Sequence, residues 1–236
     1  MRRFVLFLLA ILIVVLSVSC ALQNEPLTTL PEPILLDENF EDGTIDSELG
    51  CYSPSDLFIP KIVQDGDNSV LQLSSSTDSL FALGLSDEDI PMYSGAAFGG
   101  GPNQRTINTS WDYEVKYLMK VVSQVDSGKG IITISFRYYG DSFDCRTNLN
   151  VFSSLDFHLY SYPTLTQNDL MISITQGIWV EVKIVSKSSG YEIYIDDTLA
   201  FEEADSPVEL TNCTWEVADG MTVYLDDISI IRTDIL

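Results

Sequence analysis

The sequence predicts an all-β fold, an antiparallel two-sheet sandwich of jelly-roll type over residues 34–236. Apolar and polar residues alternate in most segments after Ile34, which is the pattern of half-buried strands. Short turn sequences separate these segments, and no stretch of twelve or more residues has the apolar spacing of a helix. About twelve short strands in this arrangement are typical of a sandwich, and one such domain often runs to about 200–250 residues.

The first 19 residues predict a signal peptide. Met1, Arg2 and Arg3 form a short basic segment, and an apolar run of about 15 residues follows from Phe4 to Val18. This run has the length of a signal-peptide core and is shorter than the roughly 20 residues that a membrane-spanning helix needs. We therefore expect the rest of the chain to be exported from the cytoplasm.

The apolar run ends at Leu16–Cys20, where small residues lead directly into a cysteine. This segment resembles the lipobox of bacterial lipoproteins, although Ser17 stands where that family favours leucine. The resemblance implies that Cys20 is lipidated, that residues 20–33 form the lipidated cysteine and a proline-containing tether, and that the protein is anchored at the cell membrane or cell surface. A soluble secreted protein and an uncleaved anchor remain the alternatives.

The exported part of the chain is strongly acidic. The whole sequence has a formal net charge of −23, and removal of residues 1–19, which contain two arginines and no acidic residue, changes it to −25. Nucleic acids and anionic lipid surfaces bind basic protein surfaces, so this charge argues against both as partners. It favours solubility, cation binding or neutral ligands such as sugars.

The number of cysteines in the exported part is odd. With Cys20 assigned to the lipid, Cys51, Cys145 and Cys213 remain. In an oxidising compartment this predicts one disulfide and one free thiol; three pairings are possible, and we favour Cys145–Cys213. A zinc site is not expected, because the chain has one histidine, His158, and no Cys-x-x-Cys pair.

Most of the predicted strands lie after residue 110, and turn sequences that contain glycine separate them. They cover Trp111–Val121, Ile132–Tyr138, Leu155–Leu159, Val180–Ile184 and Tyr191–Ile195. The longest break between apolar runs is Ser86–Ser110, which contains Pro91 and Gly99–Pro102. We expect this segment to be a loop, and a loop of this length in a compact domain is usually functional or mobile.

Four segments resemble known β-sandwich families. Trp179–Val185 followed by Gly190–Asp197 is similar to a strand pair of concanavalin A-like domains of the laminin-G and glucanase type. The opening Leu36–Gly43 and the closing Val223–Ile230 are similar to the first and last strands of jelly-roll carbohydrate-binding modules. The resemblance implies the same sandwich over about residues 34–232; it says less about activity, because such folds carry many functions.

The same resemblance implies a structural calcium ion, because first-strand and last-strand carboxylates often share one in those modules. The candidate ligands are Glu41, Asp42 and Asp226. Calcium takes about six to eight oxygen ligands, and these carboxylates would converge if the first and last strands pair. The alternative is that they are solvated charges that protect a sheet edge from aggregation.

Catalytic patterns are absent from the sequence. The resemblance to sandwich glucanases implies a Glu-x-Asp-x-x-Glu strand, but Glu181 stands alone on its strand and Glu202–Asp205 lacks the spacing. A Ser-His-Asp hydrolase would have to use His158, which lies on an alternating strand where a histidine is usually structural. We assign no catalytic residue, and a glycoside hydrolase is the least favoured function.

Aromatic and polar residues close together in the sequence predict a sugar site. Sugar rings stack on aromatic faces, while their hydroxyl groups bond to carboxylate, amide and guanidinium groups. The candidate ligand-binding residues are Tyr138, Tyr139, Tyr160, Arg137 and Asp141, with Tyr138 on the inward register at a strand end. The alternative is that the tyrosines fill the core or are present because tyrosine favours strands.

The sequence thus predicts a cell-surface lipoprotein with a non-catalytic, carbohydrate-binding sandwich. Its expected partners are a polysaccharide and, through the lipid anchor, the membrane. A structural or protein-interaction module of a surface complex, with protein partners, is the alternative that the residues leave open.

Overall fold

The computed structural model describes residues 34–53, 58–75, 94–98, 112–123, 132–140, 143–151, 155–161, 166–204, 213–217 and 220–235. For 132–140, 143–150, 160–161 and 166–167 it describes the backbone. One compact unit extends from Pro33 to Leu236. Within the described ranges, no helix has the length and apolar character needed to cross a membrane.

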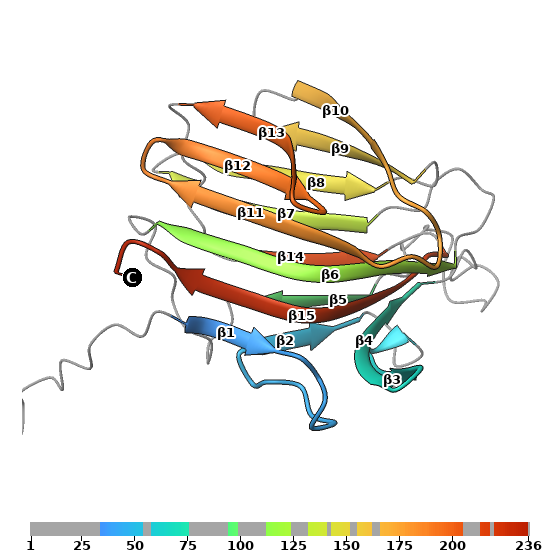
Figure 1. Cartoon of the computed structure of the whole chain (residues 1–236). Coiled ribbons are helices and arrows are strands. Elements are labelled where there is room, and N and C mark those ends of the chain that lie inside the picture. Colours follow the sequence, from blue (N-terminus) through green and yellow to red (C-terminus); the bar gives the residue numbers. More distant parts are fainter. Residues whose placement is uncertain are drawn as a thin grey trace, which may run out of the picture. The chain divides into compact units, whose positions relative to one another are not determined.

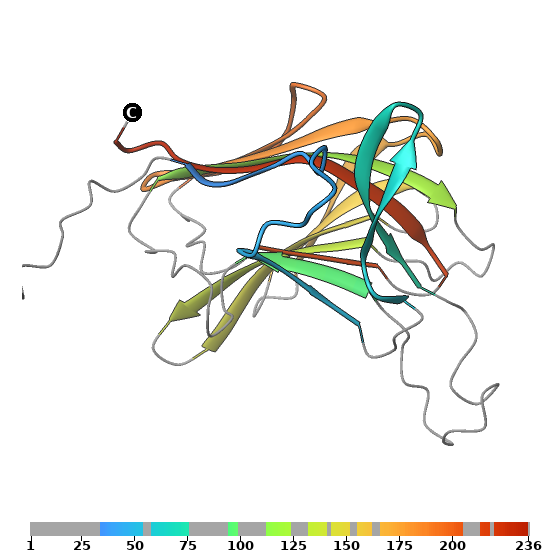
Figure 2. The ribbon, with the colours of Figure 1, turned by 90° about the horizontal axis from the view of Figure 1, so that it is seen from below.

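Two antiparallel sheets form the unit (Figure 1). Sheet A has the order β13 (Thr198–Ala204), β12 (Gly190–Ile195), β11 (Val180–Lys187), β6 (Tyr113–Ser123), β15 (Thr222–Arg232), β4 (Asn68–Ser74) and β3 (Lys61–Asp65), and β1 (Ile34–Glu38) also pairs with β15. Sheet B has the order β10 (Thr166–Ser173), β9 (Asp156–Ser161), β8 (Phe143–Val151), β7 (Ile132–Gly140), β14 (Cys213–Val217), β5 (Ser94–Phe98) and β2 (Leu49–Tyr52). Figure 2 shows the sheets as two layers, which confirms the predicted two-sheet sandwich.

The last strand, β15, lies inside sheet A. It pairs with β6 on one side and with β4 and β1 on the other. Leu36 of β1 stands opposite Ile230 of β15, so the first and last strands are neighbours, as the resemblance to jelly-roll modules implies. The pairing of β15 with β6 is irregular between Asp226 and Ser229, where Asp227 has a φ of 46°.

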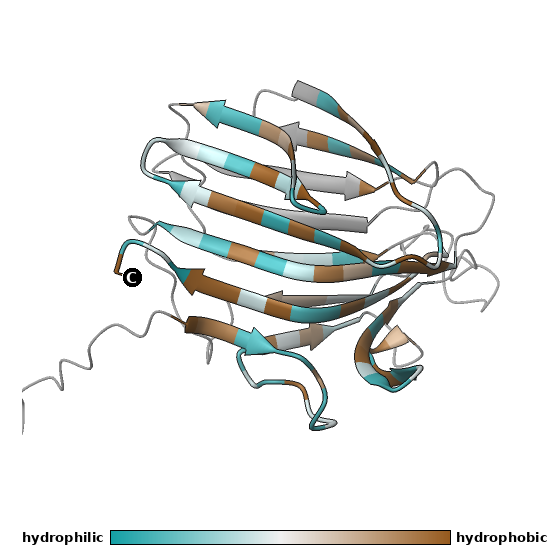
Figure 3. Ribbon diagram, viewed as in Figure 1, coloured by the Kyte–Doolittle hydropathy of each residue, from teal (hydrophilic) through white to brown (hydrophobic). Residues whose placement is uncertain are grey.

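The core consists of the inward positions of both sheets. Along β6, Tyr113, Val115, Tyr117 and Met119 are buried while the residues between them are partly exposed, as the period-two pattern predicts. Figure 3 shows the same alternation of hydrophobic and hydrophilic residues along the strands of sheet A. Tyr117 contacts Trp215 of β14 edge-to-face across the sandwich, with ring centroids 5.7 Å apart. Each large apolar side chain buried here contributes about 1.5–3 kcal/mol.

Two expectations from the sequence are wrong. The segment Ser86–Ser110 is not a loop throughout, because Ser94–Phe98 forms β5 between β14 and β2. Its sequence, Ser-Gly-Ala-Ala-Phe, has little strand propensity, so neighbouring strands rather than local preference make it extended. The described residues form fifteen strands, more than the roughly twelve expected.

The expected disulfide is also wrong. Cys51 and Cys213 are free thiols, and each of the three possible pairings needs one of them. The favoured pair, Cys145–Cys213, lies on β8 and β14, which are separated by β7. Adjacent strands are about 4.8 Å apart, so the two Cα atoms are too distant for the roughly 7 Å limit of a disulfide. Burial raises the pKa of the Cys51 thiol to about 11, which keeps it protonated and unreactive.

The β3–β4 hairpin is fixed to the outer face of sheet A by its turn. Lys120 of β6 forms an ion pair with Asp65 at the end of β3, and Trp179 Nε1 donates a hydrogen bond to Asp65 Oδ2 at 3.2 Å. The Lys120 Nζ atom lies 4.9 Å from the ring centroid of Trp179 and 5.3 Å from that of Tyr224. Lys120 is buried, so this cluster joins β6, β3, β15 and Trp179, the residue before β11, through one desolvated charge.

Replacement of Lys120 by alanine should lower the free energy of unfolding by about 1–3 kcal/mol, because Asp65 then loses its cation in a partly buried site. Urea denaturation measures the change. Lys116→Ala is the matched control: it removes a lysine of the same strand whose side chain is 39% exposed and pairs with Glu181 at 2.8 Å. The control should cost less than about 1 kcal/mol, and equal losses for both variants would contradict the role given to Lys120.

Candidate functional site

A row of polar positions crosses the outer face of sheet B. Paired residues of neighbouring antiparallel strands lie on the same face of a sheet. The row runs through successive partners on β5, β14, β7, β8, β9 and β10: Gly95, Glu216, Thr133, Asn150, His158 and Asp169. Trp215 and Phe157, which neighbour members of the row in sequence, are buried. The row therefore lies on the side of sheet B that faces away from the core.

The backbone register brings three of the predicted ligand-binding residues onto this face. Arg137 and Tyr139 of β7 come four and six positions after Thr133, and Tyr160 of β9 comes two positions after His158. Even spacing along a strand puts each of them on the same face as that residue. Tyr138 occupies the opposite face, as its inward register predicts. Asp141 lies outside the described residues.

A tyrosine and a glutamate meet at the β2 end of the same face. Tyr52 Oη donates a hydrogen bond to Glu216 Oε2 at 3.1 Å. The tyrosine ring lies over Gly95, where an added Cβ would be 2.5 Å from the ring carbon Cζ. A side chain at this position would displace the tyrosine ring, so glycine makes room for it. Sequence reasoning missed this pair, because 164 residues separate its members; the only local signal was a glycine within a run of small residues.

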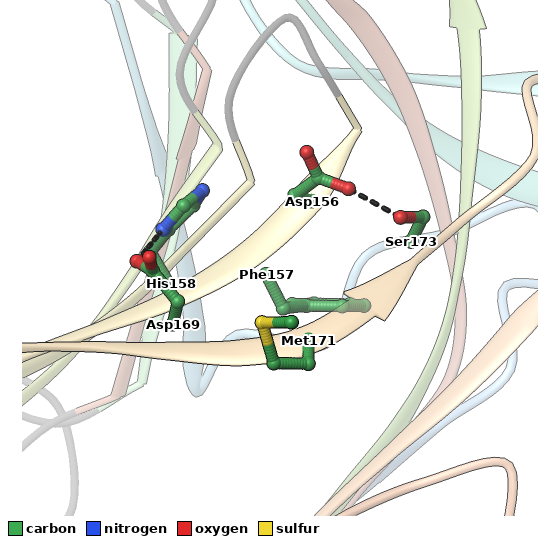
Figure 4. A pocket seen from close by; sticks show the side chains of 6 residues that line it. All are labelled: Asp156, Phe157, His158, Asp169, Met171 and Ser173. Atoms are coloured by element: carbon green, nitrogen blue, oxygen red, sulfur yellow. Dashed lines mark hydrogen bonds and ion pairs between the residues drawn. The ribbon is translucent and has the colours of Figure 1, made fainter.

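A hollow opens at the other end of the face, where β10 leaves the regular register (Figure 4). Asp169 pairs with His158 and Ser173 pairs with Asp156, so β10 advances four residues while β9 advances two. The two extra residues separate the strands and leave a space of about 260 Å³. Asp156, Phe157, His158, Asp169, Met171 and Ser173 line it.

The polar side chains of the hollow form two separate pairs. His158 Nδ1 lies 2.6 Å from Asp169 Oδ1, and the Ser173 hydroxyl donates to Asp156 Oδ1. Figure 4 shows the two pairs at opposite ends of the hollow. Serine has one donor proton, and here it goes to Asp156 rather than to an imidazole. The pairs therefore do not form the relay in which histidine activates a serine nucleophile.

Met171 is unusual in both its backbone and its exposure. Its φ is 57°, in the left-handed region that non-glycine residues rarely adopt, and its side chain is 91% exposed. The bulge of β10 holds it in this conformation at the rim of the hollow. Strain of this kind costs about 1–3 kcal/mol and often marks a functional site.

The predicted calcium ligands are only partly brought together. Burial raises the pKa of Asp226 to about 6; the charges of Asp227, Glu41 and Asp65 act in the same direction, and a hydrogen bond from the Asp227 amide opposes them. Glu41 is thus within electrostatic reach of Asp226, and Glu41 Oε1 accepts a hydrogen bond from Ser69 N at 3.2 Å.

Asp42 has a different environment. It accepts hydrogen bonds from the amide and hydroxyl of Thr44, both at 2.8 Å, and these bonds lower the pKa of its exposed carboxyl. Across the ranges that the structure describes, no three His, Cys, Asp or Glu side chains are grouped as metal ligands. Calcium binding by Glu41, Asp42 and Asp226 therefore stays a prediction.

Solved structures share this architecture at low sequence identity. The cellulose induced protein Cip1 is 12% identical, with a TM-score of 0.59 over 84% of this chain and 97% of that one. A GH16 protein of a Bacteroides ovatus mixed-linkage glucan locus, in complex with a product, is 10% identical, with a TM-score of 0.57 over 84% and 99%. Domain 4 of AbnA, a GH43 arabinanase of Geobacillus stearothermophilus in complex with arabinotriose, is 13% identical, with a TM-score of 0.52 over 84% and 92%.

The fold is a concanavalin A-like jelly-roll sandwich. At these low sequence identities, the structural similarity establishes the fold of the chain but not its activity. No family model matches the sequence, and no curated protein matches it.

Asp226→Asn should raise the free energy of unfolding at pH 7.5 by about 1–3 kcal/mol in the presence of a chelator. The pKa of this carboxyl is higher in the folded chain, about 6, than its ordinary value of 3.8, so ionisation opposes folding above pH 6. The gain should shrink as the pH falls and vanish below about pH 4, where the carboxyl is protonated in both states. Thermal melts across this pH range measure it.

Added calcium gives a second readout of the same variant. If calcium binds Asp226, it stabilises the wild type and not Asp226→Asn, and the order of melting temperatures reverses. Asp67→Asn is the control, because Asp67 is an exposed aspartate of the β3–β4 turn. A lower melting temperature of Asp226→Asn with chelator at pH 7.5 would contradict the burial argument.

Proposed function

We propose that this chain is an exported, lipid-anchored protein whose jelly-roll domain binds carbohydrate without catalysing a reaction on it. The outer face of sheet B supports this proposal most directly. It carries the Tyr52–Glu216 pair at one end and a hollow lined by two carboxylates, an imidazole and a hydroxyl at the other. An aromatic face with hydrogen-bonding groups beside it is the combination that a sugar ring needs.

The charge of the chain limits the class of carbohydrate. A protein with a net charge of −23 repels polyuronates and sulfated glycans at long range. Carboxylates instead accept hydrogen bonds from the hydroxyl groups of neutral sugars. The expected ligand is therefore a neutral polysaccharide or glycan.

Glu181 and Glu216 do not supply the carboxyl pair of a retaining glycosidase. A retaining glycosidase needs two carboxyl groups about 5–5.5 Å apart on either side of the sugar bond. Glu181 lies on the outer face of sheet A and pairs with Lys116 at 2.8 Å, so it does not contribute to sheet B. Glu216, on sheet B, is hydrogen-bonded to a tyrosine rather than to a second carboxyl.

A glycan array tests the proposal. The full chain in detergent, with calcium and separately with chelator, should bind a neutral glycan. Tyr52→Ala should weaken that binding at least tenfold, because ring stacking and the orientation of Glu216 are both lost. Tyr194→Ala is the matched control, since Tyr194 Oη also donates to a glutamate, Glu192, at 2.8 Å, but from the outer face of sheet A.

The outcomes of the array separate the alternatives. Equal loss in both variants would mean that sheet B is not the binding face. If the wild-type protein bound no neutral glycan on the array, carbohydrate binding would be overturned and a protein-interaction module would be favoured. Calcium-dependent binding would place the ion in the function.

The anchor is tested separately. Cys20→Ala should move the protein from the membrane fraction to the soluble fraction of cells that express it, because the thiol that carries the lipid is lost. Cys51→Ala, which removes a partly exposed thiol of the sandwich, should leave the protein in the membrane fraction. Membrane retention of Cys20→Ala would contradict lipid anchoring.

A further inference from the structure

We propose that the hollow beside the β10 bulge binds the terminal sugar ring of a neutral glycan. This inference rests on the proposed carbohydrate binding and names the site and the part of the ligand that it holds. Six side chains of β9 and β10 carry it.

The size of the hollow fits one ring. Its volume is about 260 Å³, below the roughly 300–1,000 Å³ of pockets that hold larger organic ligands. The Asp156–Ser173 pair stands at one end and the His158–Asp169 pair at the other (Figure 4). A ring between the pairs has polar groups at both ends, so the hollow suits a unit that ends a chain better than one that continues in both directions.

The lining matches the two kinds of surface on a sugar. Met171, which is 91% exposed, offers an apolar surface to the C–H face of a ring, while Phe157 is fully buried and belongs to the core. The carboxylates of Asp156 and Asp169 accept hydrogen bonds from hydroxyl groups. The same carboxylates repel a uronic acid or a sulfate ester, which restricts the site to neutral units.

The conformation of Met171 provides an independent argument. Its left-handed φ is unfavourable for methionine, and its 91% exposed side chain gains almost nothing from burial in the free protein. Glycine would adopt this backbone without strain and would expose no apolar surface. The methionine therefore has no stabilising role that would explain it, whereas a ligand in the hollow would cover it.

Binding of monosaccharides to the full chain in detergent tests the inference. In saturation-transfer difference NMR, at least one of glucose, galactose, mannose and arabinose should give a signal, and glucuronic acid should give none. The same monosaccharide should displace the neutral glycan that binds on the array. Signal from glucuronic acid alone, or displacement only by longer oligosaccharides, would overturn the inference.

Variants locate the site. Met171→Gly and Asp169→Asn should each weaken binding of the array glycan at least tenfold, and Met171→Gly should melt no lower than the wild type because its backbone strain is relieved. Ile59→Ala, which removes a side chain that is 51% exposed, and Asp67→Asn, in the exposed β3–β4 turn, are the matched controls and should bind normally.

The failure of the hollow as the binding site can be distinguished from the failure of carbohydrate binding itself. Normal glycan binding by Met171→Gly and Asp169→Asn would overturn the hollow as the site and leave carbohydrate binding by sheet B intact. Absence of any glycan binding by the wild type would overturn both.

Discussion

The sandwich depends on the position of β15, the last strand of the chain. β15 pairs with β6, β4 and β1, so the two halves of sheet A are joined only when the C-terminal residues arrive. Its inward side chains, Val223, Leu225, Ile228 and Ile230, are all buried in the common core. Contacts between residues so distant in sequence close large loops, and their entropy cost must be offset by burial in that core.

The two outer faces of the sandwich differ in how their polar groups are satisfied. On sheet A, lysines pair with acids of the same face, as in Lys116–Glu181 and Lys183–Asp197, and Lys120 is enclosed by Asp65 and two aromatic rings. These groups fix the hairpin and the strands to one another. On sheet B, a bulge opens the ladder between β9 and β10 and exposes acids, a histidine and a methionine around a space. The first face stabilises the fold, and the second carries the proposed sugar site.

Two of the places where local rules are broken are irregularities of a strand. Asp226 is a buried carboxyl beside Asp227, which has a positive φ, at the bulge of β15. Met171 is an exposed apolar side chain with a positive φ at the bulge of β10. Natural sequences usually agree locally with their fold, so such conflicts mark positions kept for something other than stability. The first belongs to the predicted calcium site and the second to the proposed sugar site.

The sequence by itself determined the all-β class and the inward and outward alternation of strands such as β6 and β11, because period-two patterns and turn residues act locally. The strand pair β11–β12 was indicated by a resemblance. The sequence also indicated that β1 and β15 are neighbours, through a resemblance. Only the tertiary structure decided that Ser94–Phe98 is a strand, that Cys213 is free, and that Tyr52 meets Glu216 over Gly95. It also revealed the hollow at β10. These features depend on which strands become neighbours and in what register. Pairing between strands more than 40 residues apart is set by the packing of the whole core rather than by a local segment of the chain.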